Sequence, residues 1–175
     1  MSKSSSRPAS PAGRMAAPLD ATDKAMLAAL TDDARISIRA LADRLNISRA
    51  NAYSRLDRLT RDGVITGFGA RVDPKLAGLG TSAYVLLTVE QMAWRSLKAA
   101  LHEMPYIEHI ALVGGDFDVL LLVRTPDNAT LRDVVLEHIH AMEGVRGSRT
   151  WLIFEEGDGP GAPWPRPGEG RKGNG

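Results

Sequence analysis

Basic and polar side chains gather in the segment RLNISRANAYSRLDRLTRDGVI, residues 44–65. Arginine can bind the edge of guanine or a phosphate, asparagine can pair with adenine, and serine can donate to a phosphate. Within the segment, only Asp57 and Asp62 supply opposite charge beside the arginines of its helix. The side chains that could contact double-stranded DNA are Ser48, Arg49, Asn51, Ser54, Arg55 and Arg58.

The arginines of this segment could contact DNA or could simply form a solvated helix face, as most runs of charged residues do. The elements around the segment distinguish these two interpretations. Apolar residues recur at helical spacing in three bursts between residues 19 and 63. The first burst follows the candidate N-caps Asp20 and Thr22 and buries Met26, Leu27 and Leu30. The second begins at Ser37 and buries Ile38, Leu41, Ala42 and Leu45.

The third burst is the segment with the arginines. Ser48 is its expected N-cap, its buried face is Ala52, Leu56 and Leu59, and it ends at Gly63. The alternating residues 64–74 predict a small hairpin. Three helices, a short turn before the third and a hairpin are typical of a winged helix-turn-helix, whose second helix of the pair enters the major groove. This order favours DNA contact.

The second half of the chain changes to strand-like runs. Strands are expected at 81–89, 107–115, 118–124 and 148–154, with helices at 92–104 and 128–142. The order βαββαβ predicts a ferredoxin-like α+β sandwich. The strand segments YVLLTV, VLLLV and WLIF do not alternate apolar with polar residues, so both sheet faces require cover. A second copy is expected to cover the face without helices, which predicts a homodimer and the two-fold partner that a helix-turn-helix usually needs.

The turn GGDFD, residues 114–118, could bind a small ligand or merely connect two strands. Free backbone N–H groups at such a turn could hold a carboxylate, and Asp116 or Asp118 could bind an ammonium group. A plain hairpin turn explains the same residues.

Composition narrows the classes of protein. The chain of 175 residues has a net charge of +1 and no cysteine, which excludes disulfides and thiolate chemistry and suits a reducing cytoplasm. Residues 1–75 hold 13 Lys and Arg against 8 Asp and Glu, whereas residues 76–157 hold 6 against 11, so only the first part is expected to meet a polyanion. No segment predicts a membrane span or a secretory signal.

Four segments are expected: a disordered tail at 1–18, a DNA-binding domain at 19–75, a dimerisation and ligand-sensing domain at 76–156, and a second tail at 157–175. His138 and His140 lie two apart on an expected helix and point away from each other, so no metal site is expected. No cofactor motif is present.

The sequence resembles the Lrp/AsnC, or feast/famine, family of transcriptional regulators. The resemblance is carried by LDATDKAMLAAL, ISIRALADRLNIS, SRLDRLTRDGVI, GFGARVDPKLAGLG, GGDFDVLLLV and EGVRGSRTWLIF. It implies a cytoplasmic DNA-binding regulator, not an enzyme, that forms dimers and rings such as octamers and responds to an amino acid or related metabolite. The family's effectors bind near such a turn, between neighbouring dimers, so the expected effector residues are Gly114, Gly115, Asp116, Phe117 and Asp118. Ser148 and Thr150, at the start of the last strand, are expected to add hydroxyl groups to this site.

Two positions depart from the family's pattern. Ala52 stands where a branched apolar residue is common, and Gly114 where a threonine is frequent. Two other classes of function have their own sequence requirements. A small dimeric ferredoxin-like enzyme or metabolite-binding protein would need convergent titratable groups, and an RNA-binding module would need exposed aromatic residues interleaved with basic ones. The sequence shows neither pattern.

Overall fold

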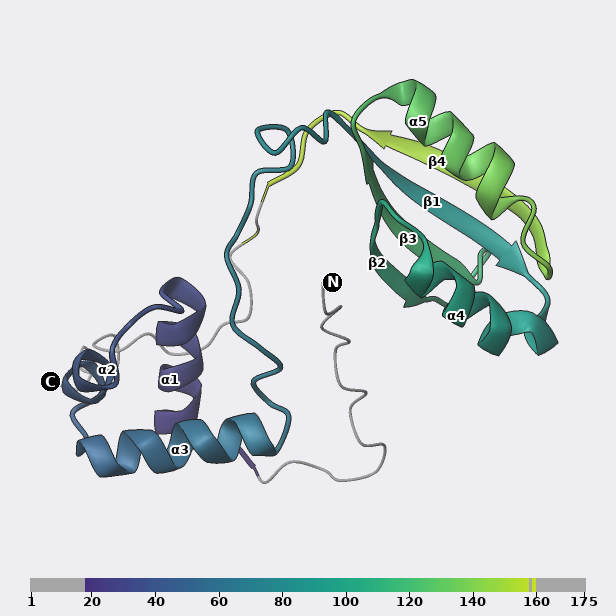
Figure 1. Ribbon diagram of the computed structural model, residues 1–175. Coiled ribbons are helices and arrows are strands. Elements are labelled where there is room, and N and C mark those ends of the chain that lie inside the picture. The colour runs from purple at the N-terminus through teal and green to yellow at the C-terminus, as the bar shows by residue number, and fades with distance from the viewer. Residues whose placement is uncertain (1–17, 158, 160–175) are drawn as a thin grey trace, which may run out of the picture. The chain divides into compact units, whose positions relative to one another are not determined.

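The computed structural model describes residues 18–157 and 159, and the chain divides into two compact units that meet between Ala70 and Arg71 in the sequence (Figure 1). The expected tails at 1–18 and 157–175 lie almost entirely outside the described residues. Each unit has its own apolar core, and each is described by itself.

The first unit is built from α1 (Ala21–Asp32), α2 (Ile38–Leu45) and α3 (Arg49–Arg61). Each helix begins where a side chain accepts a backbone N–H that the helix itself leaves unpaired. The N-caps are Asp20, Ser37 and Ser48. Of the two candidates for the first helix, Asp20 is therefore confirmed and Thr22 is wrong, because Thr22 lies within α1. Asp20 and Asp23 form a reciprocal capping box. Between α2 and α3, Asn46 takes the left-handed conformation with φ 53°, which ends α2 and makes the turn tight.

The expected core of this unit is confirmed. Met26, Leu27, Leu41, Ala42, Ala52 and Leu59 are buried, and Leu30, Ile38, Leu45 and Leu56 pack partly buried against them. Ala29 is also buried. The small side chain of Ala52 is fully enclosed, so the helices fit closely at this point.

The prediction of a hairpin at 64–74 is wrong in this structure, because none of the described residues 62–80 lies in a β-strand. Val64 and Ile65 pack partly buried against the helical core, but residues 66–73 are exposed. A two-stranded hairpin is marginal without a packed apolar face. Gly67 and Gly69 supply no side chain to such a face.

The second unit is a four-stranded antiparallel sheet with helices, and its βαββαβ order is confirmed. The strands are β1 (Thr81–Val89), β2 (Ile107–Leu112), β3 (Val119–Thr125) and β4 (Val145–Ile153), in the order β2-β3-β1-β4. The first connection is η1 (Gln91–Ala93) followed by α4 (Trp94–Glu103). The second is α5 (Asn128–Asp133), which continues as the π-helical η2 (Val134–Ile139) where one regular helix was predicted.

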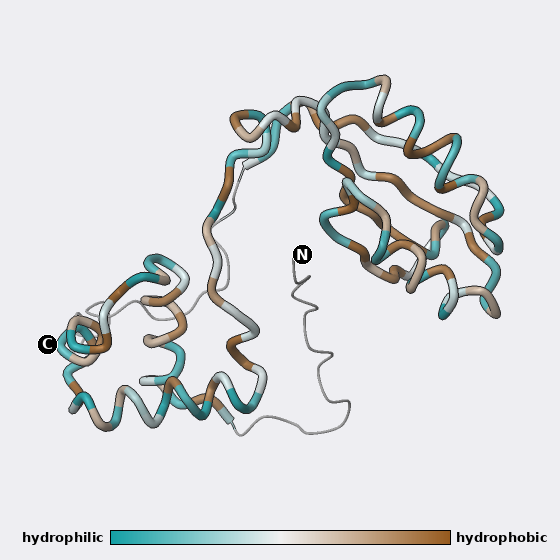
Figure 2. Tube along the Cα trace, in the orientation of Figure 1, coloured by the Kyte–Doolittle hydropathy of each residue, from teal (hydrophilic) through white to brown (hydrophobic). Residues whose placement is uncertain are grey.

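One face of the sheet holds the core with α4, α5 and η2 (Figure 1). Alternate residues of the two central strands are buried there, and apolar residues run along both strands in Figure 2. The core residues are Ala83, Val85, Leu87, Val89, Leu97, Leu101, Val119, Leu121, Val123, Leu131, Val134, Val135 and Ile139.

The opposite sheet face is also largely apolar, as predicted. Tyr84 lies between Leu122 on β3 and Trp151 on β4, and Leu86 lies opposite Leu120. Residues opposite each other on neighbouring strands share a face. Tyr84 is 38% exposed and Trp151 is 52% exposed. We call this surface, comprising Tyr84, Leu86, Leu120, Leu122 and Trp151, the open sheet face.

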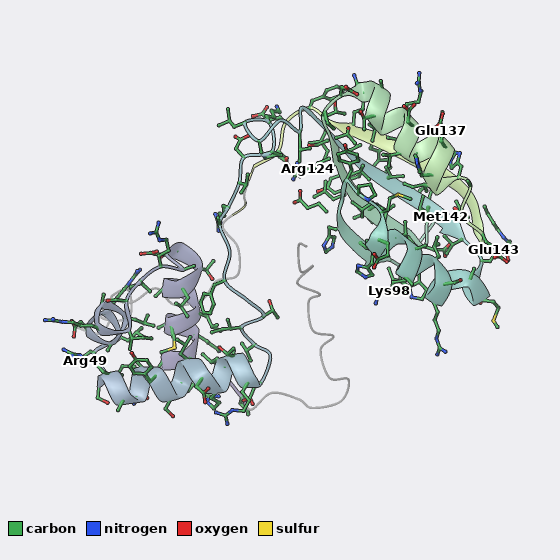
Figure 3. The ribbon with its side chains drawn as sticks, viewed as in Figure 1. Arg49, Lys98, Arg124, Glu137, Met142 and Glu143 are labelled. Atoms are coloured by element: carbon green, nitrogen blue, oxygen red, sulfur yellow. The ribbon has the colours of Figure 1, made fainter. Side chains whose placement is uncertain are left out.

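Arg124 closes one end of the open sheet face (Figure 3). Its guanidinium donates to Glu108 and Glu156, each at 2.5 Å, and to the hydroxyl of Ser82 at 2.8 Å. The hydrogen bond with Glu156 is the main cause that raises the pKa of Arg124 and lowers that of Glu156. The chain beyond β4 is thereby fastened to the sheet. Among the described residues, none of the helices is both long and apolar enough to cross a membrane.

Candidate nucleic-acid interface and effector turn

The first turn of α3 presents polar side chains to solvent. The Asn51 N–H donates to the hydroxyl oxygen of Ser48 at 3.1 Å, which leaves the hydroxyl proton of Ser48 free to donate outward. Arg49 follows at the start of the helix (Figure 3). Ser48, Arg49, Asn51 and Ser54 are all exposed, as predicted. These four side chains form a surface that can bind an anionic, hydrogen-bonding partner.

Arg55 and Arg58 are engaged within the unit. The Nη1 atom of Arg55 lies 2.6 Å from Asp20 Oδ2 and 2.7 Å from Asp23 Oδ1. The Nε atom of Arg55 donates to Asn51 Oδ1 at 2.8 Å. Arg58 Nη2 lies 2.6 Å from the same Oδ1 of Asp23. These two side chains are 23% and 31% exposed, so both are directed partly toward α1.

Asp23 is the centre of this network and is 1% exposed. Burial acts to raise the pKa of Asp23, but hydrogen bonds from Arg58 and Arg55 outweigh it, so its pKa lies below the ordinary value. The pKa of Asp20 is also lowered, first by the Asp23 backbone N–H and then by Arg55. Both carboxylates are therefore held in the charged form.

These ion pairs were not predicted from the sequence, because their carboxylates lie on α1 and not within α3. A signal was present. Asp23 precedes Met26, Leu27 and Leu30 by three, four and seven positions, which places a carboxylate on the buried face of α1. A buried carboxylate requires a cationic partner. The pair expected within α3, Arg61 with Asp57, is present.

The turn at 114–118 is held mainly by backbone contacts of Asp118. Its carbonyl accepts from the N–H of Val113 at 2.9 Å, and its N–H donates to the carbonyl of Leu87 at 2.9 Å. Its carboxylate accepts from the N–H of Val89 at 2.8 Å. Gly115 has φ 132°, a conformation that favours glycine. Asp116 is exposed, and a side chain at Gly114 would meet open space.

Ser148 and Thr150 lie across β1 from this turn. Leu87 pairs with Val119 on one side and with Ser148 on the other, so one strand separates the two groups of residues by about 10 Å. Ser148 contacts Nε2 of His140 at 2.5 Å beside a hollow of about 230 Å³ lined by His140, Val145, Arg146 and Gly147. Thr150 is exposed. One chain does not bring these hydroxyls against the turn.

Arg149 connects β4 with the turn instead. Its guanidinium carbon lies 5.4 Å from the centre of the Phe117 ring. Period-two alternation turns Arg149 to the sheet face opposite that of Ser148 and Thr150, alongside Leu86. The hydroxyl residues Ser148 and Thr150 were predicted to lie at the turn, but Arg149 between them is the residue of β4 that contacts it.

Comparison with known proteins identifies both units. Residues 19–66 match the family model for winged helix-turn-helix DNA-binding, and residues 82–158 match that for the Lrp/AsnC ligand binding domain. The HTH-type transcriptional regulator AldR of Mycolicibacterium smegmatis is 36% identical over 151 residues, which cover 85% of this chain and 88% of that protein. The chain belongs to the Lrp/AsnC family.

Other Lrp/AsnC proteins agree with this assignment. The leucine-responsive regulatory protein of Salmonella typhimurium is 33% identical over 141 residues, covering 79% of this chain and 86% of that protein. The crystal structure of LrpA from Mycobacterium tuberculosis superposes with a TM-score of 0.74 at 28% identity, over 84% of this chain and 100% of that chain. The protein is a DNA-binding transcriptional regulator whose first unit belongs to the winged helix-turn-helix class, although residues 64–74 form no hairpin here, and whose second unit is α+β.

Proposed function

We propose that this Lrp/AsnC regulator binds operator DNA as a homodimer with α3 in the major groove, and that an amino acid or related metabolite changes that binding. The observation that carries the proposal is the exposed polar surface at the start of α3, Ser48, Arg49, Asn51 and Ser54, on a helix whose other side is packed in the core. This surface has the donors that phosphates need and the amide that adenine needs.

Each residue has a role in the proposal. Ser48 and Ser54 donate to phosphates, Arg49 binds guanine or a phosphate, and Asn51 reads a base edge. Arg58 directs one nitrogen to Asp23, and its remaining donors can contact a phosphate. Arg55 contributes to the same interface through its hydrogen bond to Asn51.

The open sheet face supports the homodimer. Two copies packed face to face would bury Tyr84, Leu120, Leu122 and Trp151, which one chain leaves partly or largely exposed around the already buried Leu86. A two-fold axis also supplies a second α3 for a second half-site. These dimers are proposed to assemble further into closed rings, for example octamers.

The effector in the proposal is a zwitterion bound at the turn 114–118. Gly114 and Gly115 leave backbone N–H groups accessible, Asp116 offers an exposed carboxylate, and Arg149 lies near enough to Phe117 to add a cation. Ser148 and Thr150 would come from a neighbouring copy, because β1 separates them from the turn within one chain. An effector that joins copies can favour one assembly and so change DNA affinity.

Gel-shift titration of the full chain tests the proposal. A pool of random DNA duplexes, enriched by binding to the protein, supplies the operator. Arg49→Ala and Asn51→Ala are expected to weaken operator binding about 5- to 150-fold, which corresponds to about 1–3 kcal/mol. Arg95→Ala, which removes an exposed charge from α4, is the control and should leave affinity unchanged. Unchanged affinity in both α3 variants would exclude α3 as the reading helix. The proposal includes no catalytic step and places the protein with the DNA in the cytoplasm.

A further inference from the structure

Arg55 contacts Asn51 and two carboxylates of α1 at once. We infer that Arg55 is a positioning residue that fixes the amide of Asn51 for base reading and does not itself read a base. The inference rests on the proposed function, because it assigns roles within the surface of α3 that is proposed to enter the major groove.

The donors of Arg55 are already committed. A guanidinium recognises guanine with two parallel N–H donors from adjacent nitrogens, which must be either both Nη atoms or Nε with one Nη. Nη1 is held by Asp20 and Asp23, and Nε is held by Asn51. Each of these forks therefore contains a nitrogen that another residue occupies. Only Nη2 makes no hydrogen bond with Asn51, Asp20 or Asp23, and a single free nitrogen cannot supply the two parallel donors that guanine requires.

Asn51 gains a fixed orientation from the same contact. Arg55 lies four residues further along α3, so both side chains project from the same side of the helix. A guanidinium only donates, so it can face the amide oxygen but not the amide nitrogen. The Asn51 NH₂ group is thereby directed away from Arg55, and its oxygen keeps a second lone pair. Pairing with adenine needs one donor and one acceptor, which is what this orientation leaves.

The carboxylates of α1 make the arrangement rigid. Asp23 is buried and accepts from both Arg55 and Arg58, and Asp20 is tied to Asp23 by the capping box. A chain of hydrogen bonds therefore runs from Asp23, in the first turn of α1, through Arg55 to Asn51. An asparagine whose rotamer is set before binding loses less conformational entropy when it meets a base.

The test asks at which operator position each substitution reduces the discrimination between base pairs. Operator duplexes from the enriched pool are changed one base pair at a time, and their affinities are measured for the parent chain, Asn51→Ala, Arg55→Ala and the double variant. Arg55→Ala and Asn51→Ala are expected to lose discrimination at the same base pair, by roughly 10-fold. The double variant should be no worse than Asn51→Ala, because the two residues act as a unit. Arg55→Lys, which keeps the charge but lacks the Nε donor, should resemble Arg55→Ala at that base pair.

Other outcomes have distinct meanings. If Arg55→Ala relaxes a different base pair and its loss multiplies with that of Asn51→Ala, Arg55 reads its own base and the inference is wrong. If neither substitution changes discrimination anywhere, both the inference and the proposed role of α3 are wrong. Circular dichroism checks folding. Should Arg55→Ala unfold, Asp23→Asn provides the second variant and is expected to relax the base pair that Asn51 reads.

Discussion

Asp23 Oδ1 lies 2.7 Å from Arg55 Nη1, which joins the first turn of α1 to the middle of α3. The two residues are 32 positions apart in the sequence. The contact holds Arg55 against α1, although the sequence of α3 alone predicts that Arg55 contacts DNA. The helix-turn-helix is therefore held by an ionic contact as well as by its apolar core.

Removing the charge of Asp23 should destabilise the first unit. Asp23→Asn keeps the shape of the side chain but loses two charge-assisted hydrogen bonds, so the free energy of unfolding is expected to fall by about 1–3 kcal/mol. Urea denaturation followed by circular dichroism measures this change. Asp57→Asn, which removes the exposed partner of Arg61, is the matched control and should change stability by less than about 0.5 kcal/mol. Equal effects of the two substitutions would contradict the central role of Asp23.

The same network predicts a dependence of stability on pH. The folded-state pKa values of Asp20 and Asp23 lie below their ordinary values, so folding is stabilised while both groups are charged. This stabilisation is complete above about pH 4, the ordinary pKa of aspartate, and is lost as the pH falls through the lowered values. The Asp23→Asn variant should show a weaker loss of stability over that range. Parallel curves for parent and variant would count against the assignment.

A charge on the open sheet face should break the dimer. Leu122 lies next to Tyr84 at the middle of this face, so Leu122→Asp would place an unpaired carboxylate in the proposed interface. Light scattering at micromolar concentration is expected to show dimers or larger assemblies for the parent and a smaller species for the variant. Met92→Asp is the control, since Met92 is exposed and lies in η1, outside the strands that form the open sheet face. A parent chain that stays monomeric would contradict the proposal.

Gly144 should not tolerate a side chain. Its φ is +87°, and an added Cβ would lie 2.2 Å from Cβ of Ala93. Gly144→Ala therefore combines a strained backbone with a clash, and the expected loss is about 2 kcal/mol or more in the free energy of unfolding. Gly147→Ala is the control, because an added Cβ there meets nothing within 4 Å. A thermal melt in which both variants match the parent would refute the argument.

The effector turn can be tested by thermal-shift screening of the common amino acids against the full chain. An amino acid that raises the melting temperature of the parent should have a smaller effect on Arg149→Gln and Gly115→Val. The first loses the cation beside Phe117, and the second alters a turn with φ 132°. Gly114→Ser, which adds a hydroxyl in open space, should retain or strengthen the response. An equal shift in the parent, Arg149→Gln and Gly115→Val would place the ligand elsewhere.

Local patterns predicted much of this fold. The capping residues Asp20, Ser37 and Ser48, the buried faces of three helices and the βαββαβ order follow from short-range signals, and the structure confirms them. The prediction of a hairpin at 64–74 was wrong because alternation of apolar and polar residues cannot by itself stabilise two strands that lack a packed face.

The candidate site was less predictable because its contacts join residues far apart in the chain. The pairing of Arg55 with Asp23 spans 32 residues, and the contact of Arg149 with Phe117 joins the middle of β4 to the turn before β3. Helical periodicity is sufficient to place Asp23 on the inner face of α1, although the sequence-based prediction did not use it, and it does not specify which of several arginines reaches Asp23. The separation of Ser148 from the turn required the strand order, which places β1 between β3 and β4.

The most direct test of α3 in the major groove pairs one protein change with one DNA change. In the selected operator, replacing the adenine that Asn51 reads with 7-deazaadenine removes only the N7 acceptor of the major groove. Fluorescence anisotropy should show a loss of roughly 10-fold for the parent chain and little further loss for Asn51→Ala, whose contact is already absent. An equal loss for the parent and for Asn51→Ala, or no loss for the parent at any adenine of the operator, would contradict base reading by α3.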